Sequence, residues 1–128
     1  MTHCILAMPL VVVLAALPLA AQRTPDTRIS TTPAGGQNLL HPRVVATGDS
    51  VYVVWQNASL GAIHATRSLD RGATWLLADQ RLDVGLTAGD SVAPDLCANG
   101  AAVYVAWEEH RASAANGDIW CVNQNRFL

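Results

Sequence analysis

The sequence predicts an all-β protein made of a repeated antiparallel unit of four short strands. The first observation is an internal repeat, in which His41–Gln56 returns as Ala93–Glu108 at an offset of about 52 residues. The second is that the repeated runs are short, rich in Val, Tyr and Trp, and bounded by Gly, Asn and Asp, as strands are. The matched residues are Pro42 with Pro94, Gly48 with Gly100, Val51-Tyr52-Val53 with Val103-Tyr104-Val105, and Trp55 with Trp107.

The length of the repeat indicates the architecture. A period near 50 residues is typical of the four-stranded blades of β-propellers. Upstream, Thr27-Arg28-Ile29-Ser30 precedes the first unit as Gln80-Arg81-Leu82-Asp83 precedes the second. A propeller closes with roughly four to eight blades, which requires on the order of 200–400 residues, whereas this sequence has 128. We therefore expect an N-terminal fragment of a larger propeller, holding about one and three-quarter blades and lacking the C-terminal ones.

The expected order of segments follows from the repeat. An N-terminal segment, 22–40, carries the outer strand of a preceding or closing blade, the first blade covers 41–92, and a truncated second blade covers 93–128. For the end of the chain, a native degenerate unit, a frameshift tail and a truncation all stay open. The expected strands are Arg43–Ala46, Val51–Gln56, Ala62–Arg67 and Trp75–Leu82, then Asp95–Ala98, Ala102–Glu108 and Ile119–Asn123.

Between the third and fourth strands lies an eight-residue motif, S-x-D-x-G-x-T-W, formed by Ser68, Asp70, Gly72, Thr74 and Trp75. Asp can bond the backbone N–H groups of its own turn, and Gly accepts the positive φ of a tight turn. The two hydroxyls can tie the hairpin ends, and we expect the indole to anchor in the sheet below. The motif resembles the Asp-box, or bacterial neuraminidase repeat, of sialidases and other β-propellers. In those families the box lies far from the active site, so the resemblance implies a structural role.

The first 21 residues differ from the rest of the chain. Ile5 to Ala21 is almost continuously apolar, and small residues precede Gln22. This is typical of a secretory signal peptide, a helix cleaved after Ala20 or Ala21. An uncleaved membrane anchor and a misassigned start are the alternatives. We expect a secreted, extracellular or periplasmic protein with no membrane association after cleavage.

Charge and cysteine content exclude several classes of function. Eight basic and ten acidic residues leave a net charge of −2, so a nucleic-acid partner is not expected. Cys97 and Cys121 fall on strands separated by a third strand, which predicts free, buried thiols. No ligand spacing predicts a metal site, and no cofactor is expected. The sequon Asn57-Ala58-Ser59 is expected in an accessible loop.

The ligand face implied by the sialidase resemblance consists of the loops that enter the inner strands and those that join the second and third strands. The richest is the loop after the second strand of the second unit, with Glu108, Glu109, His110 and Arg111. These residues form a candidate polar rim for sugar hydroxyls or a carboxylate. The alternative is a solvated loop in which Arg111 pairs with an acidic neighbour.

Arg43 opens an inner strand, where sialidases place an arginine that clamps the sialic acid carboxylate. A guanidinium suits that task because its planar fork binds a carboxylate through two hydrogen bonds. The family's Arg-Ile-Pro order is absent, and the repeat has Asp95 in place of Arg43. Both a ligand role and a structural role therefore stay open.

Catalysis by this chain alone is not expected. A sialidase needs an arginine triad, a tyrosine nucleophile with a glutamate partner, and an acid/base aspartate. Tyr52 and Tyr104 are equivalent under the repeat, which predicts that both pack in the core. By resemblance, the parent is a sialidase-like exo-glycosidase acting on a carbohydrate substrate. The alternatives are a non-catalytic propeller module that binds glycans or proteins, and a fragment with no activity.

Alternation along the strands predicts which residues share a side of each sheet. Val51, Val53 and Trp55, with their repeat partners, are expected on one side and the tyrosines on the other. Because a blade packs between two neighbours, both sides are apolar. We expect one outer side to stay exposed in this chain, with a tendency to aggregate.

Overall fold

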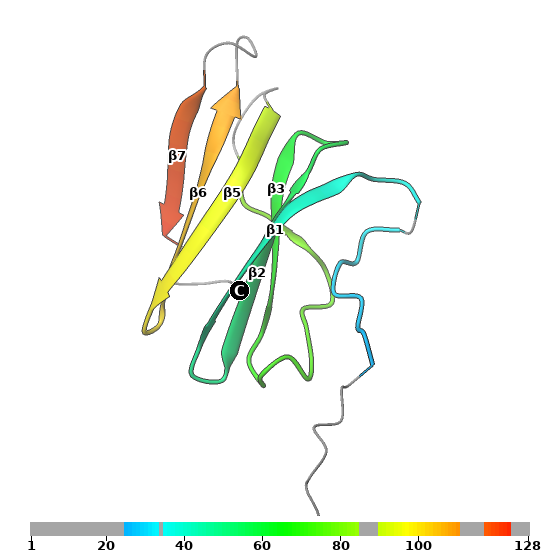
Figure 1. Ribbon diagram of the computed structural model, residues 1–128, viewed down its shortest axis with the longest axis vertical. Helices are drawn as coiled ribbons and strands as arrows, with labels where there is room; N and C mark the ends of the chain where they lie inside the picture. The colour runs from blue at the N-terminus through cyan, green and yellow to red at the C-terminus, as the bar shows by residue number, and fades with distance from the viewer. Residues whose placement is uncertain (1–24, 34, 85–89, 111–116, 124–128) are drawn as a thin grey trace, which may run out of the picture.

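The computed structural model describes residues 25–33, 35–84, 90–110 and 117–123. The predicted signal peptide, Arg111 and the last five residues lie outside this part of the chain. The described residues form two antiparallel sheets and no helix (Figure 1), which confirms the all-β class. Among them, no helix is long and apolar enough to cross a membrane.

The first sheet has four strands in chain order, and the second has three. The first contains β1 (Leu39–Thr47), β2 (Ser50–Asn57), β3 (Ala62–Ser68) and β4 (Gln80–Arg81). The second contains β5 (Asp90–Asn99), β6 (Ala102–His110) and β7 (Asp118–Asn123).

The expected outer strand Trp75–Leu82 is wrong over most of its length, because only the two residues of β4 pair with β3. The chain before β4 forms a loop instead. Leu76 still donates its N–H to the Arg67 carbonyl of β3, but the Asp79 carboxylate bonds Thr31 of the N-terminal segment, and regular pairing with β3 begins only at Gln80.

The repeat extends to the backbone conformation. His41 and Ala93 hold the same position in the two units, and both have a left-handed φ, 51° and 49°. Each lies at a register shift in its ladder, so β1 and β5 carry a bulge at the same place. Gly48 and Gly100 turn the following hairpins with φ of 58° and 60°. The two units therefore share their irregular features as well as their strands.

The core lies between the two sheets. We call the side of each sheet that carries Tyr52 or Tyr104 its tyrosine face, and the side that carries Trp55 or Trp107 its tryptophan face. The tyrosine face of the first sheet packs against the tryptophan face of the second. The buried residues of this cluster are Tyr52, Val54, Ile63, Ala65 and Leu82 with Val103, Val105 and Trp107.

The tyrosine face of the second sheet is exposed, which corrects two expectations. Tyr104 is 40% exposed, whereas Tyr52 is 8% exposed, so only one of the tyrosines is a core residue. Cys97 and Cys121 are free thiols, as predicted, but they are exposed instead of buried. Both cysteines lie on the same face as Tyr104, and no described sheet covers it.

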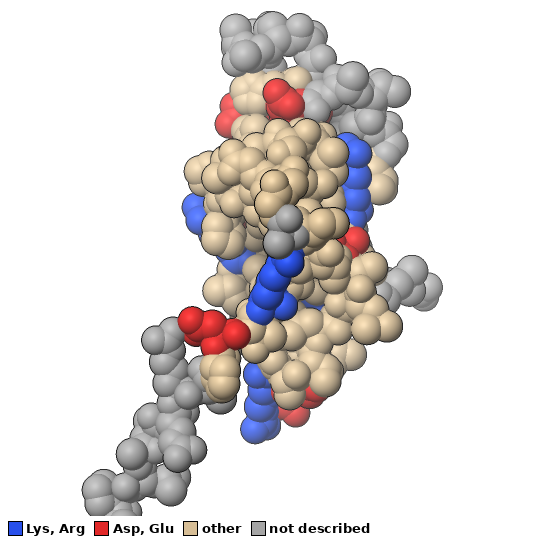
Figure 2. All heavy atoms as spheres, turned by 90° about the vertical axis from the view of Figure 1, so that its right-hand side faces the viewer, with Lys and Arg blue, Asp and Glu red and all other residues tan. Residues whose placement is uncertain are grey.

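The tryptophan face of the first sheet meets the N-terminal segment, which lies on the side away from the second sheet (Figure 1). Ile29 lines a groove there with Val53 and Trp55. Leu82, the repeat partner of Ile29, packs in the cluster with Trp107. Seen from this side, arginine and acidic side chains are scattered over a mostly uncharged surface (Figure 2).

Candidate functional site

The motif at residues 68–75 is a closed hydrogen-bonded loop. The buried Ser68 hydroxyl accepts the N–H of Gly72 at 2.7 Å and donates to Asp70 Oδ1 at 2.6 Å. Asp70 Oδ1 accepts the N–H of Thr74 at 2.8 Å, and its Oδ2 accepts the Thr74 hydroxyl at 2.6 Å. The hydrogen bonds from Ser68 and then Thr74 stabilise the carboxylate and lower the pKa of Asp70 to about 2.

Gly72 and Trp75 close this loop. Gly72 has a φ of 91°, a conformation that favours glycine. The Trp75 indole N–H donates to the Gly72 carbonyl at 3.0 Å, so the indole folds back onto the loop and is only partly buried. Arg71 joins the loop to Asp49 of the β1–β2 hairpin at 2.7 Å. These contacts are internal to the fold, as a structural element requires.

The predicted rim residues separate. Glu108 Oε1 lies 2.9 Å from His110 Nε2 on the tyrosine face of β6. Glu109, between them in sequence, is 1% exposed and lies between the sheets, because successive strand residues point to opposite sides. The structure therefore brings Glu108 and His110 together and places the Glu109 carboxylate elsewhere.

Arg43 contacts its own repeat partner. Its Nε lies 3.8 Å from Asp95 Oδ1, and its Nη1 donates to the Pro42 carbonyl at 3.2 Å. Both charged side chains remain at least half exposed. Arg43 therefore lies between the two units, apart from Glu108 and His110.

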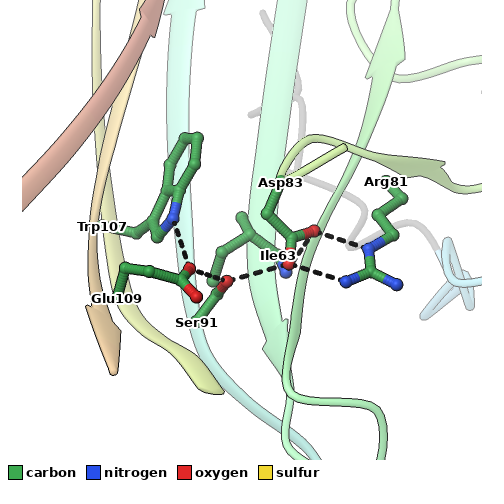
Figure 3. Close-up of polar contacts among 6 residues, drawn as sticks. All are labelled: Ile63, Arg81, Asp83, Ser91, Trp107 and Glu109. Carbon is green, nitrogen blue, oxygen red and sulfur yellow. Dashed lines mark hydrogen bonds and ion pairs between the residues drawn. The ribbon is translucent and has the colours of Figure 1, made fainter. Parts of the chain in front are cut away.

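A buried polar cluster joins the two sheets (Figure 3). Asp83, which follows β4, accepts two hydrogen bonds from Arg81 at 2.8 and 3.0 Å. Burial opposes its ionisation, but the hydrogen bonds from Arg81 and Ser91 outweigh burial and hold the pKa of Asp83 below its usual value. The hydrogen bond to Asp83 likewise raises the pKa of Arg81.

The Ser91 hydroxyl bridges two carboxyl groups. Its Oγ lies 2.8 Å from Asp83 Oδ2 and 2.6 Å from Glu109 Oε2, and the Trp107 indole N–H donates to the same Glu109 oxygen at 3.4 Å. A hydroxyl has one hydrogen to donate. The two carboxyl groups therefore share this one donor, which holds Asp83 and Glu109 close together across the interface between the sheets.

Glu109 lies in β6 and not in the expected loop, so its place in this cluster was not predicted. Its signal is nevertheless present in the sequence, because Glu109 continues the alternation of Val103, Val105 and Trp107 and must share their side of the strand. Asp83 and Ser91 are eight residues apart, one after the last strand of the first sheet and the other in the second sheet, and no local pattern predicts their approach.

The expected accessibility of the sequon is also wrong. Asn57 is fully buried, and its side-chain amide donates to Gln37 Oε1. It ends β2 on the tryptophan face, so the acceptor nitrogen is not presented to solvent in the folded chain.

His64 on the tryptophan face is uncharged near neutral pH, because burial lowers its pKa more than the nearby Asp79 raises it. Across the described residues, no group of three or more His, Cys, Asp or Glu side chains could hold a metal ion. Comparison of the chain with protein-family models, with curated proteins and with solved structures finds no match.

Proposed function

We propose that the chain is a two-unit module of a secreted, sialidase-like β-propeller protein whose loop end binds a glycan. The observation that carries this proposal is the repeat of strands, bulges and hairpins in two packed sheets, together with the Ser68–Trp75 loop. The hydrogen bonds that close this loop are made by Ser68, Asp70 and Trp75, which occupy defining positions of the Asp-box motif.

A binding role is favoured over catalysis because the tyrosine, glutamate and arginine that catalysis would need are buried or already in contact with other residues. Tyr52 is in the core, Glu109 is buried between sheets, and Arg43 is engaged with Asp95. Near the loop end, Glu108 is accessible and pairs with the partly buried His110. Paired groups of this kind suit hydrogen bonding to sugar hydroxyls.

A glycan array tests this proposal. The full chain should bind a defined set of sialylated or other glycans, and the double variant Glu108→Gln/His110→Ala should lose at least tenfold in affinity. The matched control is Arg71→Ala, at the opposite end of the strands beside Asp49, which should bind as the unaltered chain does. No binding to any glycan, or equal loss in both variants, would contradict the proposal.

A further inference from the structure

The tyrosine face of the second sheet carries apolar residues at the positions that are buried in the first sheet, but here they are exposed. Ile119 pairs with Glu108 as Ile63 pairs with Gln56, so the two isoleucines are equivalent. Ile63 is 0% exposed against the second sheet, whereas Ile119 is 78% exposed. Beside it runs a groove of ≈230 Å³. The groove is lined by Asp95, Leu96, Cys97, Tyr104, Ala106 and Cys121.

The tryptophan face of the first sheet is covered over β2 and β3 but open along β1. Val44, which lies on this face, is 66% exposed, and a groove of ≈210 Å³ lies between Ile29, Pro42 and Trp55. The Trp55 indole N–H, the Asn57 Oδ1 and the Thr66 hydroxyl are buried there without a hydrogen-bond partner among the described residues. In the second sheet, the equivalent Trp107 N–H donates to Glu109. Buried polar atoms are rarely left unpaired, and they lie here beside an open apolar groove, so this face also has the properties of an interface.

We propose that a second copy of this chain docks its first sheet, by the tryptophan face, onto the tyrosine face of the second sheet. The packing between the two sheets of one copy already shows this arrangement, and the proposed contact repeats it between copies. Such a head-to-tail interface forms a ring if its rotation closes. With four to eight blades in a propeller, a ring would take about two to four copies of the two-sheet chain.

The edge of β7 to which no described strand pairs also favours a second copy as the occupant. Within the described residues the second sheet has three strands, and nothing pairs where β4 pairs with β3 in the first. Residues 27–30 match residues 80–83, which include β4. The match extends to their contacts, since Arg28 Nε donates to Ser30 as Arg81 Nε donates to Asp83. In the docked pair, residues 27–30 of the second copy lie beside β7, while Ile29 keeps its present place.

Charge complementarity also favours a second copy. Arg43 and Asp95 hold equivalent positions and form an ion pair between units. Docking brings Asp95 of one copy next to Arg43 of the next, so that opposite charges alternate around the inner strands.

The mass of the full chain in solution tests the proposal. The chain is expressed with its own leader, its N-terminus is read by mass spectrometry, and its mass is measured by light scattering after gel filtration. We expect one discrete species of about two to four copies. Ile119→Arg should give a folded monomer, because the residue is exposed in the single chain, and Ile119→Leu should keep the assembly. A monomeric unaltered chain, or a mixture of sizes that Ile119→Arg does not change, would overturn the proposal.

Thiol labelling provides a second measurement, which reports directly whether the groove is covered. Cys97 and Cys121 line the groove, so a maleimide should label both slowly in the assembly and at least tenfold faster in Ile119→Arg. Tyr104→Arg should act in the same way and Tyr104→Phe should not. Equal labelling in the unaltered chain and in Ile119→Arg would show that the face is open and the proposal wrong. Neither measurement depends on a glycan, so its result is separate from that of the array.

Discussion

The carboxyl groups of Asp83 and Glu109 belong to opposite sides of the interface between the sheets, and one Ser91 hydroxyl contacts both. The two contacts, 2.8 and 2.6 Å, share a single hydroxyl hydrogen. Ser91 and Glu109 lie on the second sheet, while Asp83 follows the last strand of the first. The cluster therefore fixes the relative position of two apolar surfaces that would otherwise slide, because apolar packing has little directionality.

Substitution of Glu109 tests the contribution of its contacts with Ser91 and Trp107. Glu109→Gln keeps the length of the side chain and an oxygen that can accept both hydrogen bonds, so it should change the free energy of unfolding by less than about 1 kcal/mol. Glu109→Ala leaves Ser91 and Trp107 with lost contacts and should cost about 1–3 kcal/mol. Urea unfolding of both variants measures the difference. Equal destabilisation by Gln and Ala would show that an amide cannot replace the carboxyl group in these contacts.

Acid should weaken the fold through Asp70 and Asp83, whose pKa values are both lowered. A carboxyl group with a lowered folded-state pKa adds stability above its unfolded pKa, near 4, and loses that stability as the pH falls through the folded value. For Asp70 this interval runs down to about pH 2.

Urea midpoints measured between pH 6 and pH 2 check this prediction. In Asp70→Asn, the part of the pH dependence due to Asp70 should disappear, while the part due to Asp83 stays. A variant profile parallel to that of the unaltered chain over the whole interval would show that the loop does not depend on the Asp70 charge.

The repeat and the strand alternation predicted the faces of the sheets, because both depend on local periodicity. Tyr52 and Trp55 lie on opposite sides as expected, and the hydrogen bonds of Asp70 with Thr74 follow from the motif alone. The exposure of Tyr104 could not be read from the repeat, because equivalent residues differ in what covers them. The position of Trp75 was missed because its indole bonds a carbonyl three residues back and does not enter the sheet.

Gly72→Ala should destabilise the 68–75 loop. An added Cβ meets only the Trp75 ring at 3.6 Å, an ordinary contact, so the cost comes from the φ of 91°. A non-glycine residue in the left-handed region costs about 1–2 kcal/mol. Gly36→Ala is the matched control, since its Cβ meets nothing and no positive φ is required. Thermal unfolding should show a lower Tm for Gly72→Ala only, and equal Tm values would remove the argument from backbone strain.

The chain should not hydrolyse sialosides. A tyrosine nucleophile must reach the anomeric carbon at the loop end, but Tyr52 is packed between the sheets and Tyr104 lies on the side of the second sheet. Arg43 contacts Asp95 at 3.8 Å, which competes with a substrate carboxylate for its guanidinium. Much of an enzyme's rate acceleration comes from positioning several groups around one substrate. These residues lie apart from one another, so they cannot act together on one sialoside.

The assay is release of a fluorogenic aglycone from a sialoside by the purified full chain, with the Arg43→Ala variant measured in parallel. The expected result is no turnover above the rate without protein in either sample, and turnover that disappears in Arg43→Ala would establish a catalytic site that includes this arginine.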